Sequence, residues 1–321
     1  MLLEEIYEPI QEDLIEVEKR LMSITKADFS WLSEMLEYSL SGSGKRIRPA
    51  LTLLSGRFFD YNIESLQPMA AAIELMHTAT LVHDDAIDKS FIRRGRSTIN
   101  SVWGEEKAVL LGDYLFARAG EFATDTNNLD VVRLFTRTLG TISSGELSQS
   151  FSAFKLDQTY EDYIGRIGRK TASLFSLATE SGAILSRAPQ WAVQSLREYG
   201  YNLGIAFQIV DDILDFIGTE EEMGKPVGSD LVQGTLTLPA MLLVKQHAED
   251  NPVKKLFNHE DADRNVGLAI EMVCDSSIVD DCFNIALDYC TRACHSIKAL
   301  PDNHSHRALT ELTGYICRRR N

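Results

Sequence analysis

The sequence has no apolar run of the roughly 18 residues that a helix needs to span a bilayer. It also has no basic start, because the first residues, MLLEEIYEPIQEDL, carry acids where a secretory signal carries Lys or Arg. We therefore expect a cytoplasmic protein without an integral membrane segment. Since 44% of its 321 residues are hydrophobic, the chain has enough apolar material for a large buried core.

Cysteine is scarce as well. The five cysteines all lie in the C-terminal part of the chain, and none belongs to a CxxC pair. This spacing argues against a zinc site and against a disulfide framework. We expect all five to be ordinary small apolar residues on helices: Cys274, Cys282, Cys290, Cys294 and Cys317.

Positive charge is the third shortage. The 32 Lys and Arg residues face 47 Asp and Glu residues, which gives a formal net charge of -15. Binding a nucleic acid backbone draws on a cationic surface, so we exclude nucleic acid as a partner. The few basic stretches inside the chain, "GKRIRP" at 44–49 and "RRG" at 93–95, therefore require an explanation.

Strand-like alternation, internal repeats and low-complexity linkers are also absent, whereas apolar residues recur at helical spacing almost everywhere. Only eight prolines interrupt this pattern. Long helices joined by short loops imply antiparallel neighbours, so we predict one all-α domain over 1–321, an antiparallel helical bundle. The predicted helices cover about residues 2–22, 31–40, 49–59, 66–89, 105–125, 129–152, 159–187, 190–217, 231–249, 265–275, 279–299 and 304–319.

The aspartates of "LVHDDAIDKS" form the first pattern with chemical meaning. In a helix over 66–89, a rotation of about 100° per residue places Asp84 and Asp88 on one stripe with His77, and Asp85 about 80° to one side. Two carboxylates four residues apart suit a hard cation that prefers oxygen ligands. Taken alone, the same spacing is typical of a solvated acidic face.

A second stretch of the same kind, "AFQIVDDILDFIG", follows 127 residues later. There Gln208, Asp211 and Asp215 share a stripe, Asp212 lies beside it, and apolar residues surround all four. Burying unpaired carboxylates is costly, so something must neutralise them. Two such helices facing each other would hold more than one divalent ion. Mg²⁺ is favoured, because it takes its remaining ligands from water and substrate phosphates.

Basic residues near these acidic stretches indicate an anion site. Lys45, Arg46 and Arg48 flank the start of a helix at Pro49, and a helix start with nearby cations binds anions. The preceding glycines form no P-loop, because GxxxxGK[ST] is absent. In isolation this stretch could equally be a loop with exposed charges. Further polar groups in "RRG", "GRKTASLF" and "MGKPVGSDL" are Arg93, Arg94, Lys170, Thr171 and Lys225.

With both acidic stretches, "GKRIRP" and "RRG" in this order, the sequence resembles the trans-isoprenyl diphosphate synthases, the polyprenyl synthetase family, from about residue 30 to 320. The resemblance implies the isoprenoid synthase fold, with helices around a central active-site cavity, and a homodimer. It also implies that isopentenyl diphosphate elongates an allylic diphosphate, such as farnesyl diphosphate, with release of pyrophosphate. The new double bonds would be trans, and no nucleophilic triad is expected.

The resemblance also implies roles for individual residues. The expected isopentenyl diphosphate contacts are Lys45, Arg48, His77 and Arg94. The expected magnesium ligands are Asp84, Asp88, Asp211 and Asp215, and the catalytic set also includes Asp85, Asp212 and Lys170. The expected allylic diphosphate contacts are Arg93, Lys170, Thr171, Gln208 and Lys225. One position departs from the family, because "GTLTLP" has Thr235 where many members carry Lys.

Product length should depend on the residues before the first acidic stretch. Ile73, Met76, Ala79 and Thr80 line the expected tunnel over about 16 Å of helix. Short-chain relatives often carry Phe or Tyr four or five residues before the acidic stretch, whereas this chain has small residues there. It therefore resembles the long-chain members, near octaprenyl or solanesyl size. A geranylgeranyl or farnesyl product stays an alternative if another helix closes the tunnel, for instance through Phe151 or Phe154.

Three other interpretations compete with this one. A class I terpene cyclase shares the first acidic stretch, but would carry Asn, Ser and Glu metal ligands in place of the second. A non-catalytic subunit would keep the fold and usually loses its acidic stretches, and a structural bundle would bind Ca²⁺ incidentally. For a long-chain enzyme we also expect slow release of the apolar product, aided by transient membrane contact or detergent.

Overall fold

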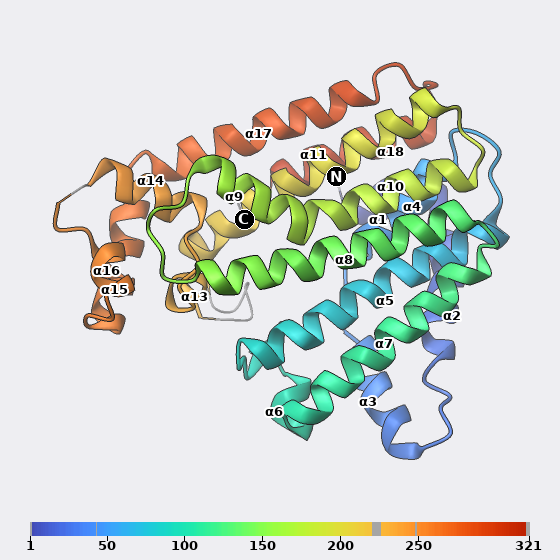
Figure 1. Ribbon diagram of the computed structural model, residues 1–321. Helices are drawn as coiled ribbons and strands as arrows, with labels where there is room; N and C mark the ends of the chain where they lie inside the picture. The colour runs from blue at the N-terminus through green and yellow to red at the C-terminus, as the bar shows by residue number, and fades with distance from the viewer. Residues whose placement is uncertain (1, 43, 220–225, 248, 319–321) are drawn as a thin grey trace.

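Helices joined by short turns make up nearly all of the structure (Figure 1). The computed structural model describes residues 2–42, 44–219, 226–247 and 249–318. The predicted all-α class is confirmed, and no helix in these ranges is long and apolar enough to cross a membrane. The elements are α1 (Leu3–Ile6), the 3₁₀ turn η1 (Glu8–Ile10), α2 (Gln11–Ser23), α3 (Ser30–Leu40), α4 (Ile47–Gly56), α5 (Ile63–Ile87), β1 (Ile92–Arg93), β2 (Arg96–Ser97), α6 (Ile99–Trp103), α7 (Glu105–Asp125), α8 (Leu129–Ser152), α9 (Tyr160–Ile167), the π-helical turn η2 (Gly168–Ala172), α10 (Ser173–Leu185), α11 (Gln190–Ile217), α13 (Ser229–Val232), α14 (Leu238–Gln246), α15 (Pro252–Phe257), α16 (Ala262–Cys274), α17 (Ile278–Ser296) and α18 (His304–Cys317).

Three helices predicted as continuous are divided in the structure. The helix predicted over 2–22 consists of α1, the 3₁₀ turn η1 and α2. The helix predicted over 159–187 consists of α9 and α10, with the π-helical turn η2 between them. The helix predicted over 231–249 consists of α13 and α14. Gly234, with a φ of 77°, lies between these two helices, and Pro239 then occupies the first turn of α14.

A short hairpin follows α5 and corrects the expectation of a chain without strands. β1 pairs with β2 in antiparallel fashion, with Arg93 opposite Arg96. The two residues between them, Arg94 and Gly95, have φ values of 52° and 72°, as a tight hairpin turn requires. Each strand has only two residues, which is too short for an alternating pattern to appear in the sequence.

The long helices run antiparallel to their neighbours in the chain, as predicted (Figure 1). α5 packs along α7, and α10 packs along α4 and α11. α5 and α11 run in the same direction, so their C-terminal ends lie toward the same end of the bundle (Figure 1). These ends carry the two acidic stretches, and the short helices α13 to α16 gather on the same side.

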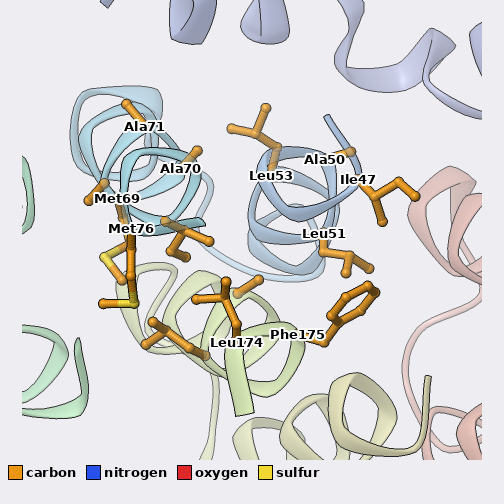
Figure 2. Close-up of a cluster of buried hydrophobic side chains, with 14 of the residues drawn as sticks. Ile47, Ala50, Leu51, Leu53, Met69, Ala70, Ala71, Met76, Leu174 and Phe175 are labelled. Carbon is orange, nitrogen blue, oxygen red and sulfur yellow. The ribbon is translucent and has the colours of Figure 1, made fainter. Parts of the chain in front are cut away.

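Two apolar cores hold the helices together. In the larger core, side chains of α4, α5 and α10 meet, among them Leu51, Met76 and Phe175 (Figure 2). The smaller core lies among α9, α11 and α13 to α17. α11 contributes to both, with Leu203 in the first and Ile205 in the second. Packing against both cores therefore fixes α11 and, with it, the second acidic stretch.

The cysteines differ from the expectation. Cys290 of α17 and Cys317 of α18 form a disulfide, whereas all five cysteines were expected to be unpaired. These residues are 27 positions apart, and the packing of α17 on α18 brings them together, which a spacing pattern does not reveal. Cys274, Cys282 and Cys294 are free, as expected.

The contact between α10 and α4 gives a first prediction. A Cβ at Gly182 would overlap the carbonyl oxygen of Thr52 and press on Ser55. We predict that Gly182→Ala lowers the free energy of unfolding by about 1–3 kcal/mol, because the α4 backbone has to move. Gly267→Ala in α16 is the control: its Cβ meets nothing within 4 Å, so it should gain up to about 1 kcal/mol in helix propensity. Urea unfolding measures both, and equal stabilities would contradict this packing.

Candidate active site

Arginines lie near both acidic stretches. Asp84 lies in the last turn of α5 and Asp88 caps that helix, while Asp211 lies near the end of α11. Arg48 at the start of α4 and Arg94 in the hairpin turn both interact electrostatically with Asp211. Because Arg94 follows α5 by only a few residues, the end of α11 lies near the end of α5.

Lys170, in the π-helical turn η2, lies between carboxylates of two other helices. Its Nζ is 3.6 Å from Oδ2 of Asp84 and 2.9 Å from Oε1 of Glu146 in α8. Burial alone would lower the pKa of Lys170, but Asp84 and Glu146 raise it overall, so the ammonium group stays charged. Burial raises the pKa of Asp88, which Lys170 opposes and Asp84 increases further. The end of α5 thus carries more negative charge than one lysine neutralises.

Asp85 has a different partner from its neighbours. Nε of Arg93 donates a hydrogen bond of 2.7 Å to Oδ1 of Asp85. Asp85 is buried, which raises its pKa, and the charge of Arg93 lowers it again in part. This ion pair fixes the hairpin to the end of α5. Arg93, an expected allylic diphosphate contact, therefore already binds a carboxylate.

A series of hydrogen bonds connects η2 and α9 with α11. Oγ1 of Thr171 donates to Oε1 of Gln208 at 2.6 Å. Nε2 of Gln208 donates to Oδ1 of Asp212, and the hydroxyl of Tyr163 donates to Oδ2 of Asp212, both at 2.8 Å. Asp212 is buried, which raises its pKa to about 7. Asp212 thus orients Gln208 and, through it, Thr171.

Asp215 is also buried, at 1% exposure, and it organises the turn after α11. Its carboxylate accepts hydrogen bonds from the Ser229 hydroxyl at 3.1 Å and from the Asp230 N–H at 3.2 Å. The N–H of Gly228 donates to its main-chain oxygen at 2.8 Å. These bonds fix the start of α13. They give Asp215 a structural role that the sequence did not suggest, and its role as a metal ligand stays a prediction.

The stretch "GKRIRP" contains two arginines with different surroundings. Arg46 has a φ of 49° and pairs with Glu18 and Glu74 at 2.8 Å each. Arg48 lies over the ring of Phe175, and its Nε is buried without a hydrogen-bond acceptor among the residues that the structure describes. Because such burial is costly, Arg48 is suited to an anionic ligand.

His77 lies among positive charges. Burial, followed by the charges of Arg48 and Arg94, holds the pKa of His77 well below its ordinary value, so the imidazole is neutral. A neutral imidazole donates one hydrogen bond and accepts another. A cavity of about 120 Å³ borders both His77 and Arg94. Three of the four expected isopentenyl diphosphate contacts are therefore neighbours.

The other expected contacts are placed as follows. Lys45 is exposed, and its Nζ lies 5.5 Å from the ring centroid of Tyr315. Thr235 is half-buried, and its N–H donates to the Asp230 carbonyl at 2.8 Å. Lys225 lies outside the described residues.

The expected tunnel residues lie on the apolar part of α5. Ile73, Met76 and Ala79 are fully buried, and Met76 points toward α10 (Figure 2). Thr80 is half-buried and donates a hydrogen bond of 2.7 Å to the His77 carbonyl. The side of α5 before the first acidic stretch is thus apolar, as the tunnel prediction requires.

Three residues of this site lie outside the sequence motifs. Glu146 holds Lys170, Glu74 holds Arg46, and Tyr163 holds Asp212. Glu74 is a charged residue within the apolar run AAAIELM of α5, a signal that could have drawn attention to it. Tyr163 lies in α9 between Asp162 and Arg166 and has no such signal. Glu146 has no such signal, because its neighbours in the chain include polar and exposed residues.

The residues at the ends of α5 and α11 fit a hard divalent cation. Within the described ranges, no group of three or more His, Cys, Asp or Glu side chains forms a complete metal cage. Mg²⁺ does not need one, because it usually binds one or two carboxylates and keeps waters or substrate phosphates as its other ligands. Asp84 and Asp88, one turn apart and only partly neutralised by Lys170, provide such a donor set.

Comparisons with known proteins agree with this geometry. The polyprenyl synthetase family matches residues 29–273. Heptaprenyl diphosphate synthase component 2 of Bacillus subtilis (strain 168) is 36% identical, over 98% of this chain and 90% of that protein. Chloroplastic solanesyl-diphosphate synthase 2 of Oryza sativa subsp. japonica is 34% identical, over 98% of this chain and 79% of that protein. The crystal structure of a polyprenyl synthase from Caulobacter crescentus CB15, complexed with calcium and isoprenyl diphosphate, has a TM-score of 0.95 and 32% identity, over 100% of this chain and 98% of that one.

The helical bundle with arginines facing paired carboxylates defines an enzyme of the isoprenoid synthase fold. The chain belongs to the polyprenyl synthetase family, and it is a prenyltransferase. The resemblance inferred from the motifs is thereby confirmed.

The hydrogen bonds around Asp212 give a second prediction. Tyr163→Phe removes one of the two side-chain donors to a buried carboxylate, so we expect the free energy of unfolding to fall by about 1–3 kcal/mol. Tyr201→Phe on α11 is the control, because Tyr201 is 39% exposed and should lose less than about 0.5 kcal/mol. Urea unfolding measures both variants. A Tyr163→Phe protein as stable as Tyr201→Phe would show that Asp212 does not depend on this bond.

Proposed function

We propose that the enzyme adds isopentenyl diphosphate repeatedly to an allylic diphosphate, such as farnesyl diphosphate, and releases a long all-trans prenyl diphosphate and pyrophosphate. The observation that carries this proposal is Arg48, whose buried Nε has no acceptor among the described residues and whose surroundings include Asp211. A diphosphate would supply the missing acceptor. The family and the solanesyl and heptaprenyl synthases that resemble this chain support the same reaction.

In this proposal the two diphosphates bind different groups. The contacts of isopentenyl diphosphate are Lys45, Arg48, His77 and Arg94, and those of the allylic diphosphate are Arg93, Lys170, Thr171, Gln208 and Lys225. The mutual proximity of Arg48, His77 and Arg94 supports the first set. The second set is supported by η2, which presents Lys170 next to Asp84 and Thr171 next to Gln208. Asp85 and Asp212 act as positioning residues, because each is bound within the protein.

We propose Mg²⁺ as the metal, with Asp84 and Asp88 as its ligands from α5 and Asp211 and Asp215 as its ligands from α11. When bound, it would stabilise the charge on the departing pyrophosphate. The calcium in the related Caulobacter structure supports a hard cation with oxygen ligands. Asp215 would share its carboxylate between the cation and Ser229.

The contribution of the apolar residues is to exclude water. Departure of pyrophosphate leaves an allylic cation, which the double bond of isopentenyl diphosphate attacks before a proton is lost, and water would destroy this cation. The fully buried α5 residues Ile73, Met76 and Ala79 provide a dry surface next to Asp84. No nucleophilic side chain is required.

A long product is favoured over a geranylgeranyl or farnesyl one. The two side chains that could close the tunnel from α8 and the segment after it do not support a short product. Phe151 is 77% exposed, and Phe154 packs on Phe257 and His259. Small residues such as Ala79 therefore leave the path along α5 without a bulky aromatic stop.

We further propose that the chain acts as one domain and as a homodimer in the cytoplasm. Five large apolar side chains on the outward faces of α7 and α8 support an interface there. They are Val109, Leu110, Leu129, Leu147 and Phe151, with exposures from 40% to 77%. The word "component" in the name of the Bacillus relative favours a second candidate, an enzyme that requires a different partner chain.

The reaction is tested with the purified chain, Mg²⁺, farnesyl diphosphate and labelled isopentenyl diphosphate. We expect linear prenyl chains by chromatography, and no product after EDTA treatment. Asp84→Asn should lower kcat/KM by about 100-fold or more, and Asp302→Asn, an exposed control, should not. Cyclic hydrocarbons would indicate a terpene cyclase. No incorporation by the chain alone would favour a subunit that needs a partner, or a structural bundle.

Product length tests the tunnel. Ala79 is fully buried on α5, five residues before Asp84, so Ala79→Tyr should block the path and shorten the product sharply. Ala117→Tyr is the control, because Ala117 is exposed on α7. Chromatography of the products sizes the chains. An unchanged length in Ala79→Tyr would reject this tunnel.

A further inference from the structure

The two ends of the chain meet at the basic loop before α4. α18 packs against α1, η1 and α4, and η1 packs against α4 (Figure 1). Residues 29–273 match the family, so both end segments lie outside the matched region. The loop itself carries Lys45, a predicted contact to isopentenyl diphosphate.

Two tyrosines, one from each end, contact Lys45. The hydroxyl of Tyr7 donates a hydrogen bond of 3.0 Å to the main-chain carbonyl of Lys45. The ring of Tyr315 in α18 lies 5.5 Å from the Nζ of Lys45, within the roughly 6 Å at which a cation and a ring attract each other. The backbone and the charged tip of Lys45 are therefore held separately, by residues from opposite ends of the chain.

Tyr7 is well suited to this role. It is 9% exposed, and burial raises its pKa above the ordinary value, with Tyr315 and Glu74 adding to the rise. The hydroxyl thus stays protonated and remains a donor. The same interactions place Tyr7 and Tyr315 near each other, so the two ends form one support.

Lys45 needs such support because of where it lies. It follows Gly44 in a loop that also contains Gly42, it is exposed, and its side chain is long and flexible. A free lysine loses up to about 2 kcal/mol of rotamer entropy when it is fixed against a ligand. The ring of Tyr315 and the hydrogen bond from Tyr7 would restrict Lys45 before the ligand binds. Less rotamer entropy would then be lost on binding.

We propose that Tyr7 and Tyr315 are positioning residues that hold Lys45 in place for the diphosphate of isopentenyl diphosphate. This inference rests on the proposed function, in which Lys45 binds that substrate. It gives the N-terminal segment and α18 a role in substrate binding.

Steady-state kinetics with each substrate varied tests the proposal. Tyr315→Leu should raise KM for isopentenyl diphosphate about three- to ten-fold, with kcat and KM for farnesyl diphosphate within about two-fold of wild type. Tyr315→Phe keeps the ring and should restore the wild-type value. Tyr7→Phe should raise the same KM about two- to five-fold, because it removes only the hydrogen bond.

A double mutant separates positioning from a loss of fold. In a Lys45→Ala background, Tyr315→Leu should have no further effect on KM for isopentenyl diphosphate, because the residue it positions is gone. Tyr199→Phe is the matched control. The Tyr199 hydroxyl also donates to a main-chain carbonyl, that of Leu309 in α18 at 2.7 Å, and it does not contact Lys45. It should lower the melting temperature and leave both KM values unchanged.

The outcomes that overturn the proposal are distinct from failure of the proposed function. An unchanged or lower KM for isopentenyl diphosphate in Tyr315→Leu overturns it, as does an equal rise in both KM values. If the wild-type enzyme makes no prenyl chains, the proposed function fails. Titration calorimetry with isopentenyl diphosphate alone then still decides, because Tyr315→Leu should weaken binding about three- to ten-fold. Absence of binding by the wild type would overturn both.

Discussion

The site depends on one constraint. Carboxylates lie at the C-terminal ends of two helices, α5 and α11, that run in the same direction. A helix carries partial negative charge at its C-terminal end, so Asp84 and Asp88 on α5, and Asp211 and Asp215 on α11, add charge where the backbone already disfavours it. Such an arrangement persists only if positive charge lies nearby. Lys170 supplies one part of it and the arginines around His77 supply another, and a divalent cation would complete it. The unfavourable placement of these acids therefore supports the proposed place of the chemistry.

Both acidic stretches use their middle carboxylate in the same way. In each stretch the middle aspartate is buried and bound within the protein: Asp85 to Arg93, and Asp212 to Tyr163 and Gln208. A residue next to the active stripe points about 100° away from it, toward the neighbouring element. The middle aspartate can thus fix that element in each stretch, and in the second stretch Asp215 is bound within the protein as well. The hairpin with Arg94 and the position of Gln208 both depend on such a fastening.

The sequence was sufficient for the helical class, for the two acidic stretches and for the basic residues, because all of these rest on local periodicity and spacing. It was insufficient where a contact joins distant parts of the chain. Glu146 and Lys170, 24 residues apart, meet only because α8 packs on η2. Arg46 pairs with Glu18 and Glu74, and Arg48 is left to face the site. This pairing depends on a φ of 49° at Arg46, which no sequence pattern predicts. The disulfide between Cys290 and Cys317 was missed for the same reason. The hairpin was missed because strands of two residues are too short to show an alternating pattern.

An acidic protein that binds polyanions needs regions whose local charge differs from its net charge. The two halves of this site attract an anion in different ways. Around His77, burial lowers the pKa of Arg94 and the charges of Arg93 and Arg46 lower it further, so this half favours an anion directly. At the ends of α5 and α11 the charge is negative, and an anion can bind only together with a cation. One diphosphate would therefore bind through guanidinium groups and the other through metal. Because the two halves attract an anion by different means, this arrangement would let the enzyme distinguish two substrates with the same diphosphate group.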